Sequence, residues 1–599
     1  MALLTTATII AFPLSRYMAW IMGGKYRPWS VLGWFEKRLN SGPQNWKQYA
    51  GSLLFFNTLM FVFGFLVLVL QPWTPLNPDD KTMLAPSTIF NSVASFMTNT
   101  DIQHYAGEQH LSNFSQIFFG IFMLFMSAAV GLSVLTAVIR ALRGDSSLGN
   151  FFVDMWRVLL YMFVPISFVI GLFFITQGTP MTFQTSCHVS TLEHAAMGTT
   201  DRGEAKQQTI VVGPVAAFES IKMLGTNGGG FYGMNSAHPF ENPTGLSNFF
   251  NTLAMMIFPF ALVLMYGRML GRFRHGMVIF TVMWVLMAAT VVWTVYFDTL
   301  NPNPGLTGHE ARTYEVPNAK APNGKQVVSL PAVASLPVDQ HQGNLEGKEM
   351  RFGTSAGATF DTLTTDVTCG AVNSEEDSLN PIAALGPMVG MWLNCIFGGK
   401  GVGMINMLLY VIIGIFIAGM MVGRTPEYLG KKIEAREVKL AVIALLVHPF
   451  MILFPTGLFA ATSWGLQAIS NPGAHGFSQI LYQFSSASAN NGSAFDGLGV
   501  TYGFYNAVSP APSAIAFDIA TGIVMLMSRY LPIIAPLAMA AYLGAKKTSP
   551  FGLGTLRDDS LTFGCLVFGT VLIIGALLFL PVAALGPIAD HLGPMPFGG

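Results

Sequence analysis

Four short polar segments, spaced through an otherwise apolar chain, carry residue types that could bind a cation. Each is rich in Thr, Asn, Ser or Gly: FMTNTDIQ (96–103), LGTNGGGF (224–231), TDVTCGAV (365–372) and ASANNGSAF (487–495). Backbone carbonyls, hydroxyls and amides in such loops can replace the hydration shell of an alkali cation. The segments lack the paired Cys and His ligands typical of a zinc site. They therefore predict a site for an alkali cation, of the kind seen in potassium-channel filters.

The four segments align on a three-residue centre that recurs along the chain. The intervals are roughly 120 to 140 residues, and such regular spacing indicates an internal repeat. The predicted cation-binding residues are Thr98-Asn99-Thr100, Thr226-Asn227-Gly228, Thr368-Cys369-Gly370 and Asn490-Asn491-Gly492.

Glycine occupies the last position in three of the four centres, and Thr100 is the exception. Pointing successive carbonyls at one axis requires left-handed backbone, which costs a residue with a side chain roughly 1–2 kcal/mol. Glycine adopts this backbone freely. We therefore predict that Gly228, Gly370 and Gly492 allow four loops to form one ring of carbonyls.

The elements around these loops follow from composition. The chain has 599 residues, 52% hydrophobic and 10% charged, whereas soluble proteins have about 25% charged residues. Lys plus Arg and Asp plus Glu are equal at 31 each, so no overall field favours nucleic acid. Apolar runs long enough to cross a bilayer are predicted at ten places: 1–22, 51–71, 115–142, 155–177, 248–267, 276–297, 401–422, 439–464, 511–528 and 561–586.

Basic residues gather in alternate loops, which the positive-inside rule assigns to the cytoplasm. This assignment places both termini outside the cytoplasm. The basic residues are Lys25, Arg27, Lys37, Arg38, Lys47, Arg140, Arg143, Arg268, Arg272, Arg274, Arg424, Lys431, Lys432, Arg436, Arg529, Lys546 and Lys547.

The other loops each hold a short run, too short to span, that ends in one of the polar centres. The predicted fold is thus an all-α polytopic membrane protein with four units of span, half-helix, polar loop and span. Half-helices entering from outside would aim their partially negative C-terminal ends at the ion. The predicted organisation is 1–50 (first helix and cytoplasmic loop), 51–143, 152–268, 276–424 and 439–545 (repeats), 298–352 (outward loop) and 561–599 (last helix).

Several longer motifs resemble one family, the potassium-binding A subunit of Kdp-type potassium-transporting P-type ATPases. They are TNGGGFYGMNSAHPFENP (226–243), SSASANNGSAF (485–495), MVGRTPEYLGKK (421–432), AVIRALRG (137–144), GNLEGKEMRFG (343–353) and SNPGAHGFSQILY (470–482). The resemblance implies the fold of the potassium-transporter superfamily, with four pore loops around a pseudo-fourfold axis. It also implies a bacterial inner-membrane complex with an ATP-hydrolysing B subunit and C and F subunits, surrounded by lipid.

The resemblance further implies roles for single residues. It places a selectivity-affecting glutamine at Gln103, whose amide we expect to support the neighbouring loop. Arg424 and Arg529 are expected at a cytoplasmic exit or subunit contact. In this family potassium leaves the filter sideways, through a tunnel towards the B subunit.

Lys400 lies in IFGGKGVGM, where glycines interrupt an apolar segment. Such an interruption indicates a discontinuous helix at a transport site. An ionisable residue at membrane depth normally faces water or a partner. We expect Lys400 either to act below the filter as a tethered cation or to extend towards a membrane interface.

The sequence also bears on three other functions. Nucleotide hydrolysis by this chain is not expected, because DDKTML (79–84) lacks Gly-Thr after Asp-Lys-Thr and GGKGVG (398–403) lacks the phosphate-loop spacing. A passive or ion-coupled potassium channel of the same superfamily would share the filter chemistry and stays an alternative. A purely structural membrane scaffold is disfavoured by four matching loops.

Overall fold

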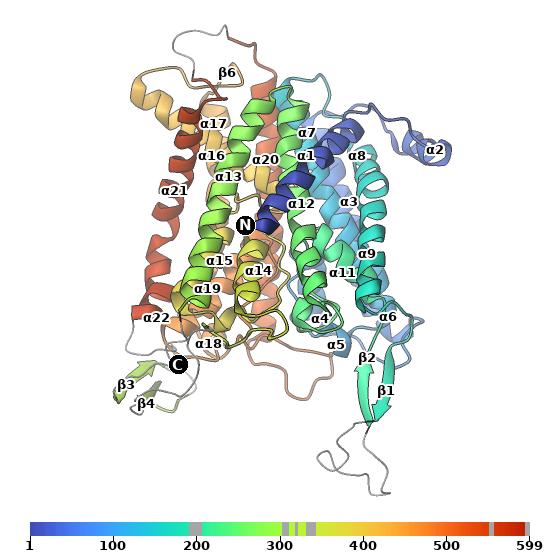
Figure 1. The fold of residues 1–599 in the computed structure, drawn as a ribbon, viewed down its shortest axis with the longest axis vertical. Helices are drawn as coiled ribbons and strands as arrows, with labels where there is room; N and C mark the ends of the chain where they lie inside the picture. The colour runs from blue at the N-terminus through green and yellow to red at the C-terminus, as the bar shows by residue number, and fades with distance from the viewer. Residues whose placement is uncertain (191–206, 302–310, 318–320, 331–342, 550–555, 593–599) are drawn as a thin grey trace, which may run out of the picture.

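The computed structural model describes residues 1–190, 207–301, 311–317, 321–330, 343–549 and 556–592. Within these residues ten helices are long and apolar enough to cross a membrane, which confirms the ten predicted spans. They run along the long axis of the molecule (Figure 1). They are α1 (Ala2–Met22), α3 (Trp46–Val69), α7 (Phe122–Arg143), α8 with α9 (Phe151–Val158, Val164–Gln177), α12 (Gly245–Met269), α13 (Phe273–Thr294), α16 (Val402–Val422), α17 (Ala435–Ala460), α20 (Ala514–Gly544) and α21 (Leu561–Ala583).

Four shorter helices lie between pairs of long ones and end at the predicted polar centres. Their lengths are 12, 10, 13 and 16 residues, which at 1.5 Å per residue is less than the roughly 30 Å of a bilayer core. Most of their side chains are buried, so they form the inside of the bundle. These half-helices are α4 (Pro86–Met97), α11 (Val215–Leu224), α14 (Thr354–Asp366) and α19 (Ala474–Ala489).

The segment around Lys400 is a broken helix, as its glycines predict. α15 (Pro381–Leu393) ends, residues 394–401 form a loop, and α16 then begins. Gly398 and Gly401 have left-handed φ values of 46° and 90°, which a continuous helix excludes.

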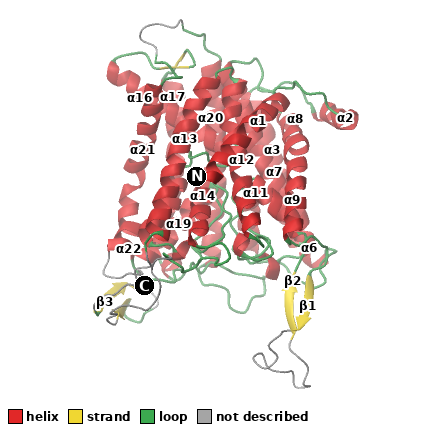
Figure 2. Cartoon of the chain, in the orientation of Figure 1, coloured by secondary structure: helices red, strands yellow, loops and turns green. Residues whose placement is uncertain are grey.

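The two ends of the bundle differ (Figure 2). One end carries the hairpins β1–β2 (Ser186–Ser190, Gln207–Val211) and β3–β4 (Arg312–Pro317, Lys325–Leu330). Each hairpin precedes a half-helix, so these half-helices start from this hairpin end. The opposite end carries α2 (Ser30–Leu39) and β5–β6 (Glu427–Tyr428, Lys431–Lys432). Parts of the predicted outward loop 298–352 and the last residues of 561–599 lie outside the described residues.

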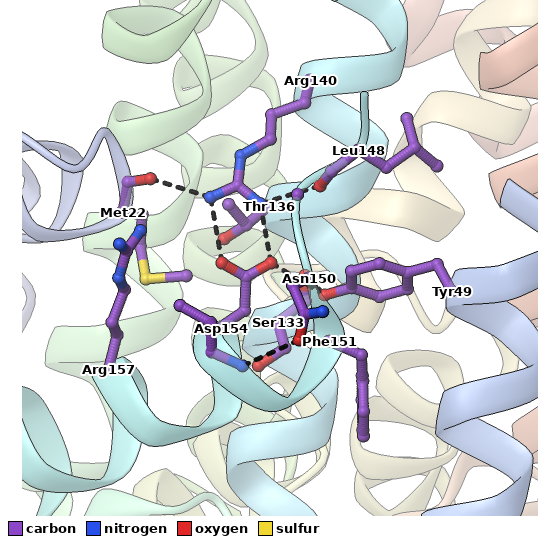
Figure 3. A network of polar contacts seen from close by, with 12 residues as sticks. Met22, Tyr49, Ser133, Thr136, Arg140, Leu148, Asn150, Phe151, Asp154 and Arg157 are labelled. Atoms are coloured by element: carbon purple, nitrogen blue, oxygen red, sulfur yellow. Dashed lines mark hydrogen bonds and ion pairs between the residues drawn. The ribbon is translucent and has the colours of Figure 1, made fainter. Parts of the chain in front are cut away.

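Arg140, which we assigned to an exposed cytoplasmic loop, is instead buried in a network that joins four helices (Figure 3). Its guanidinium contacts the Asp154 carboxylate of α8 at 2.6 and 3.0 Å, and the carbonyl of Met22, the last residue of α1, at 2.9 Å. The Tyr49 hydroxyl of α3 donates to Asp154 at 3.1 Å. The prediction was wrong because a buried ion pair and a loop charge look alike in sequence.

Arg529 is also buried rather than in a cytoplasmic loop. The predicted span 511–528 stopped before it, but α20 continues to Gly544 and places Arg529 near its midpoint. A charged residue ended the apolar window without ending the helix.

Candidate functional site

The four half-helices end with the same backbone geometry. After each, one residue takes a left-handed φ and its N–H bonds to the carbonyl three residues back, while the next N–H bonds to the carbonyl five back. This is the Schellman motif, which usually has glycine at the left-handed position. Here the position holds Asn or Thr, at a cost of roughly 1–2 kcal/mol each. The residues are Asn99, Thr226, Thr368 and Asn490, with φ of 62°, 43°, 46° and 53°.

This common geometry corrects the alignment of the first loop by one residue. Thr98 caps α4, and Asn99 rather than Thr98 is the counterpart of Thr226. Thr100 then corresponds to Asn227, and Asp101 follows in the next position. The sequence alignment was ambiguous here because Thr-Asn-Thr offers a threonine on both sides of the asparagine. Asp101 was therefore missed as a residue of the first loop.

The glycines serve two different purposes. Gly370 and Gly492 have φ values of 85° and 116°, as predicted for left-handed backbone. Gly228 lacks a left-handed φ, which its neighbour Gly229 has instead (69°). A Cβ atom on Gly228 would lie 2.6 Å from the Thr100 carbonyl oxygen. Gly228 is thus required by the close approach of another loop rather than by its own backbone angle.

Side chains of the four loops tie them into a closed ring, which we call the loop ring. The Asn99 amide donates to the Thr226 carbonyl at 2.7 Å, joining loops one and two. The Cys369 thiol donates to the Asn227 carbonyl at 3.2 Å, joining loops two and three. The bonds that complete the ring run from Asn491 to the Thr364 carbonyl (3.2 Å) and from Asn490 to the Thr100 hydroxyl (2.9 Å). Every repeat is therefore bonded to both neighbours, with the bond between the third and fourth made to the half-helix α14.

Backbone atoms of different loops approach one point. The carbonyl oxygens of Thr100 and Asn491 lie 2.6 and 3.1 Å from where a Cβ atom on Gly228 would stand. The Cα of Gly492, on the opposite loop, lies 2.9 Å from the same point. The first, second and fourth loops of the chain thus meet at one point. The arrangement can offer backbone oxygens to a dehydrated cation.

Gln103 lies beside the second loop. Its amide oxygen accepts from the Gly230 N–H at 2.9 Å, and its amide nitrogen donates to the Gly230 carbonyl at 3.1 Å and to the Tyr105 hydroxyl at 3.2 Å. The side chain is therefore tied to the neighbouring loop by two hydrogen bonds to Gly230.

The loop 394–401 crosses directly against the third loop of the ring. The Gly398 N–H donates to the Asp366 carbonyl at 3.0 Å, and the Gly399 N–H donates to the Thr368 hydroxyl. Lys400 is 1% exposed, so it does not reach an interface. Its ammonium lies 4.6 Å from the centre of the Phe258 ring and has no hydrogen-bond partner in the described part of the chain.

The two arginines predicted at an exit differ in burial and in position. Arg529 is buried, and its guanidinium donates to the Ser127 carbonyl of α7 at 3.4 Å. A Cβ atom on Gly131, one turn further along α7, would meet both this guanidinium and the Lys400 carbonyl. Arg529 therefore belongs with Lys400 next to the ring. Arg424 follows α16 at the end opposite the hairpins and is exposed.

Comparisons with known proteins match the whole chain. The family model described as "Potassium-transporting ATPase A subunit" matches residues 1–592. The "Potassium-transporting ATPase potassium-binding subunit" of Geobacillus kaustophilus (strain HTA426) is 42% identical over 594 residues, covering 98% of this chain and 97% of the relative. Among solved structures, the potassium transporter TrkH from Vibrio parahaemolyticus matches with a TM-score of 0.48 and 11% identity, over 82% of this chain and 84% of that one.

Proposed function

Because the chain belongs to the family of potassium-transporting ATPase A subunits, we propose that the loop ring is the site at which it selects potassium. The chain is the potassium-binding subunit of a potassium-transporting ATPase and a multi-pass membrane protein. It is a non-catalytic subunit, and its ion is K⁺.

The observation that carries the proposal is the closed ring of hydrogen bonds between four loops with identical helix ends. Such a ring holds backbone oxygens at fixed positions without any ion present. The C-terminal ends of the half-helices contribute partial negative charge, which favours a cation. Hydrogen bonds between neighbouring repeats also restrict the movement of the loops, and rigidity lets a site distinguish ions by size.

We place the hairpin end outside a bacterial inner membrane, with both termini extracytoplasmic. The basic loops at the opposite end support this orientation. Potassium then enters the ring from outside. ATP hydrolysis takes place on a separate B subunit, and C and F subunits complete the assembly. Arg424, at the cytoplasmic end of α16, is suited to the exit or to a subunit contact.

Lys400 and Arg529 favour a sideways route for the ion. Both are buried basic side chains close to the ring, on the side of α16. An unpaired charge of the same sign repels potassium by about 4 kcal/mol at 4 Å and an effective dielectric of 20. We propose that the Lys400 ammonium opposes direct passage to the cytoplasm, so that potassium turns towards the B subunit.

A passive or ion-coupled channel would share the ring. The match to an ATPase subunit over the whole chain favours the pump instead.

The deciding experiment measures ATP hydrolysis by the chain co-purified with its partner subunits, as a function of potassium concentration. We expect hydrolysis to require potassium. Asn490→Ala, which removes the bond to Thr100 in the ring, should raise the half-saturating potassium concentration. Asn506→Ala, at an exposed asparagine of the following outer loop, is the matched control and should leave it unchanged. Equal values for both variants would contradict the ring as the potassium site.

A further inference from the structure

The second and third repeats carry a pair of buried carboxylates at matching places. Glu219 on α11 and Asp361 on α14 each lie seven residues before the left-handed residue of their loop. A second carboxylate approaches each from the segment after the loop, Glu241 in the second repeat and Glu376 in the third. All four residues are 0% exposed.

In the second repeat a lysine ammonium fills the space between the carboxylates. The Nζ atom of Lys222 lies 2.5 Å from Glu219 and 2.6 Å from Glu241. Asn235 and Ser236 supply two further oxygens, at 2.7 and 2.8 Å. The ammonium is thus surrounded by four oxygen atoms, and it contacts both carboxylates.

In the third repeat the position of Lys222 is taken by Thr364. The two residues are equivalent because the carbonyl of each accepts the longer bond of its Schellman motif. One oxygen of each carboxylate is held, since Ser374 donates to Asp361 at 2.5 Å and Tyr482 donates to Glu376. The other oxygens, Oδ1 of Asp361 and Oε1 of Glu376, have no partner among the described residues.

The surroundings leave this pair short of positive charge. Lys348 is the nearby ammonium, and it is paired with Asp298 at 3.1 Å. Asp496 adds another carboxylate to the group, since its charge acts on Glu376. Burial raises the pKa of Asp361 to about 7, although the bond from Ser374 and the Lys348 charge both lower it. Two buried carboxylates with free oxygens need a cation or a shared proton.

We propose that a potassium ion occupies, in the third repeat, the place that the Lys222 ammonium holds in the second, bound by Asp361 Oδ1 and Glu376 Oε1. Potassium carries the same charge as the ammonium, and carboxylate oxygens suit hard cations. No group of three or more His, Cys, Asp or Glu among the described residues could hold a metal ion, so the proposed site rests on two carboxylates, without the His and Cys ligands that transition metals favour. This site, which we call the wall site, is separate from the loop ring and does not depend on the ring being the transport site.

The wall site lies beside a pocket and is connected to the ring. The pocket, of about 260 Å³, is lined by Ser374, the partner of Asp361, and by Asp496. On the other side Tyr482 joins Glu376 to the Ser493 hydroxyl (2.8 Å), which donates to the Asn491 side chain at 2.7 Å. A bound ion would therefore hold the third and fourth loops in register.

The test counts bound ions in the purified complex, using rubidium as a potassium substitute in equilibrium dialysis. We expect Asp361→Asn and Glu376→Gln each to bind one rubidium ion fewer per chain than the unmodified complex. Glu219→Gln is the matched control, because Lys222 already fills that place, and its count should be unchanged. Equal counts in all four proteins would overturn the wall site and assign a shared proton to the carboxylate pair.

A second measurement needs no substitution and decides the question if the variants do not assemble. Crystals of the unmodified complex grown in rubidium should give an anomalous diffraction peak beside Asp361 and Glu376. A peak at the loop ring with none at the carboxylates would overturn the wall site and leave the proposed function intact. Peaks at the carboxylates alone would support the wall site and contradict the ring.

Discussion

The loop ring and the region next to it, on the side of α16, differ in how closely their side chains are linked by hydrogen bonds. In the ring, amides, a thiol and a hydroxyl bond from each loop to the next. Beside it, the Lys400 ammonium lacks a hydrogen-bond partner within the described residues, and Arg529 is held by a long contact of 3.4 Å. The two regions are joined through loop 394–401.

We relate this difference to two separate functions, selecting the ion and setting the direction in which it moves. Hydrogen bonds from each repeat to the next fix the positions of the loops, which suits a site that recognises an ion by its size. An unpaired buried charge is costly and at membrane depth usually marks a transport function. We infer that the ring sets which ion binds and that the cations set where it goes next. Substitutions should therefore change affinity in one region and coupling in the other.

The largest effect is expected in the ring. Replacing Gly228, Gly370 or Gly492 with Asp should strain the loop and place a fixed charge beside the ion. Apparent potassium affinity should fall at least tenfold, or about 1.4 kcal/mol, while the complex still assembles. Half-saturation of potassium uptake measures this. Gly245→Asp, where a Cβ atom meets nothing within 4 Å, is the control. Unchanged half-saturation in all three variants would refute the carbonyl ring.

Lys400→Met should leave the potassium affinity unchanged and alter the direction in which the ion leaves the ring. Without the ammonium, passive potassium leak through reconstituted vesicles should rise in the absence of ATP, and fewer ions should move per ATP hydrolysed. Lys47→Met removes an exposed lysine at the start of α3 and should change neither quantity. Leak and coupling that both match the unmodified complex would show that Lys400 is not a gate.

Gln103→Arg should alter the choice of ion more than the amount transported. The substitution removes both bonds to Gly230, each worth about 1 kcal/mol, and so loosens the second loop. The preference for potassium over rubidium or ammonium should narrow by a few-fold in competition uptake assays. An unchanged ranking of the ions would indicate that Gln103 has no part in fixing the size of the site.

The smallest effect on transport is expected for His475, a buried cation that contrasts with Lys400 because it is fully paired. Burial disfavours its charged form, but hydrogen bonds to Asp377 and Asp590, both at 2.9 Å, raise its pKa to about 10. An unfolded histidine titrates near 6.5. The contacts of His475 with Asp377 and Asp590 therefore stabilise the fold fully below about pH 6.5, and this contribution is lost as pH rises through about 10.

Thermal unfolding of the complex between pH 7 and 10.5 measures this contribution. The melting temperature should fall by a few degrees over that range, and His475→Gln should remove most of the pH dependence. An identical slope in both proteins would show that the ion pair does not carry the stability.

The sequence was sufficient for the spans and half-helices because both depend on local patterns. Ten apolar runs and four polar centres at similar spacing reflect membrane thickness and repetition, which hydropathy reports directly. The broken helix at Lys400 could also be predicted, since its glycines are adjacent in the chain. Gln103 was located from a family resemblance and lies as expected.

Features that depend on contacts between distant segments could not be predicted. The burial of Arg140 requires Asp154 and the Met22 carbonyl, and a single basic residue gives no sign of such partners. The alignment of the first loop with the others depends on its backbone hydrogen bonds. The sequence does not reveal them, because Thr98 and Thr100 on the two sides of Asn99 make the alignment ambiguous. The exchange of Lys222 for Thr364 becomes visible only when the repeats are matched by their hydrogen bonds.

The bond that closes the loop ring, from Asn490 to Thr100, joins residues 390 positions apart. During synthesis the first loop can enter the membrane long before the fourth exists. The ring therefore stays open until residue 490 has been made and inserted. A chain released early holds no complete potassium site, so an unfinished subunit has no formed filter through which it could dissipate the gradient that the finished pump maintains.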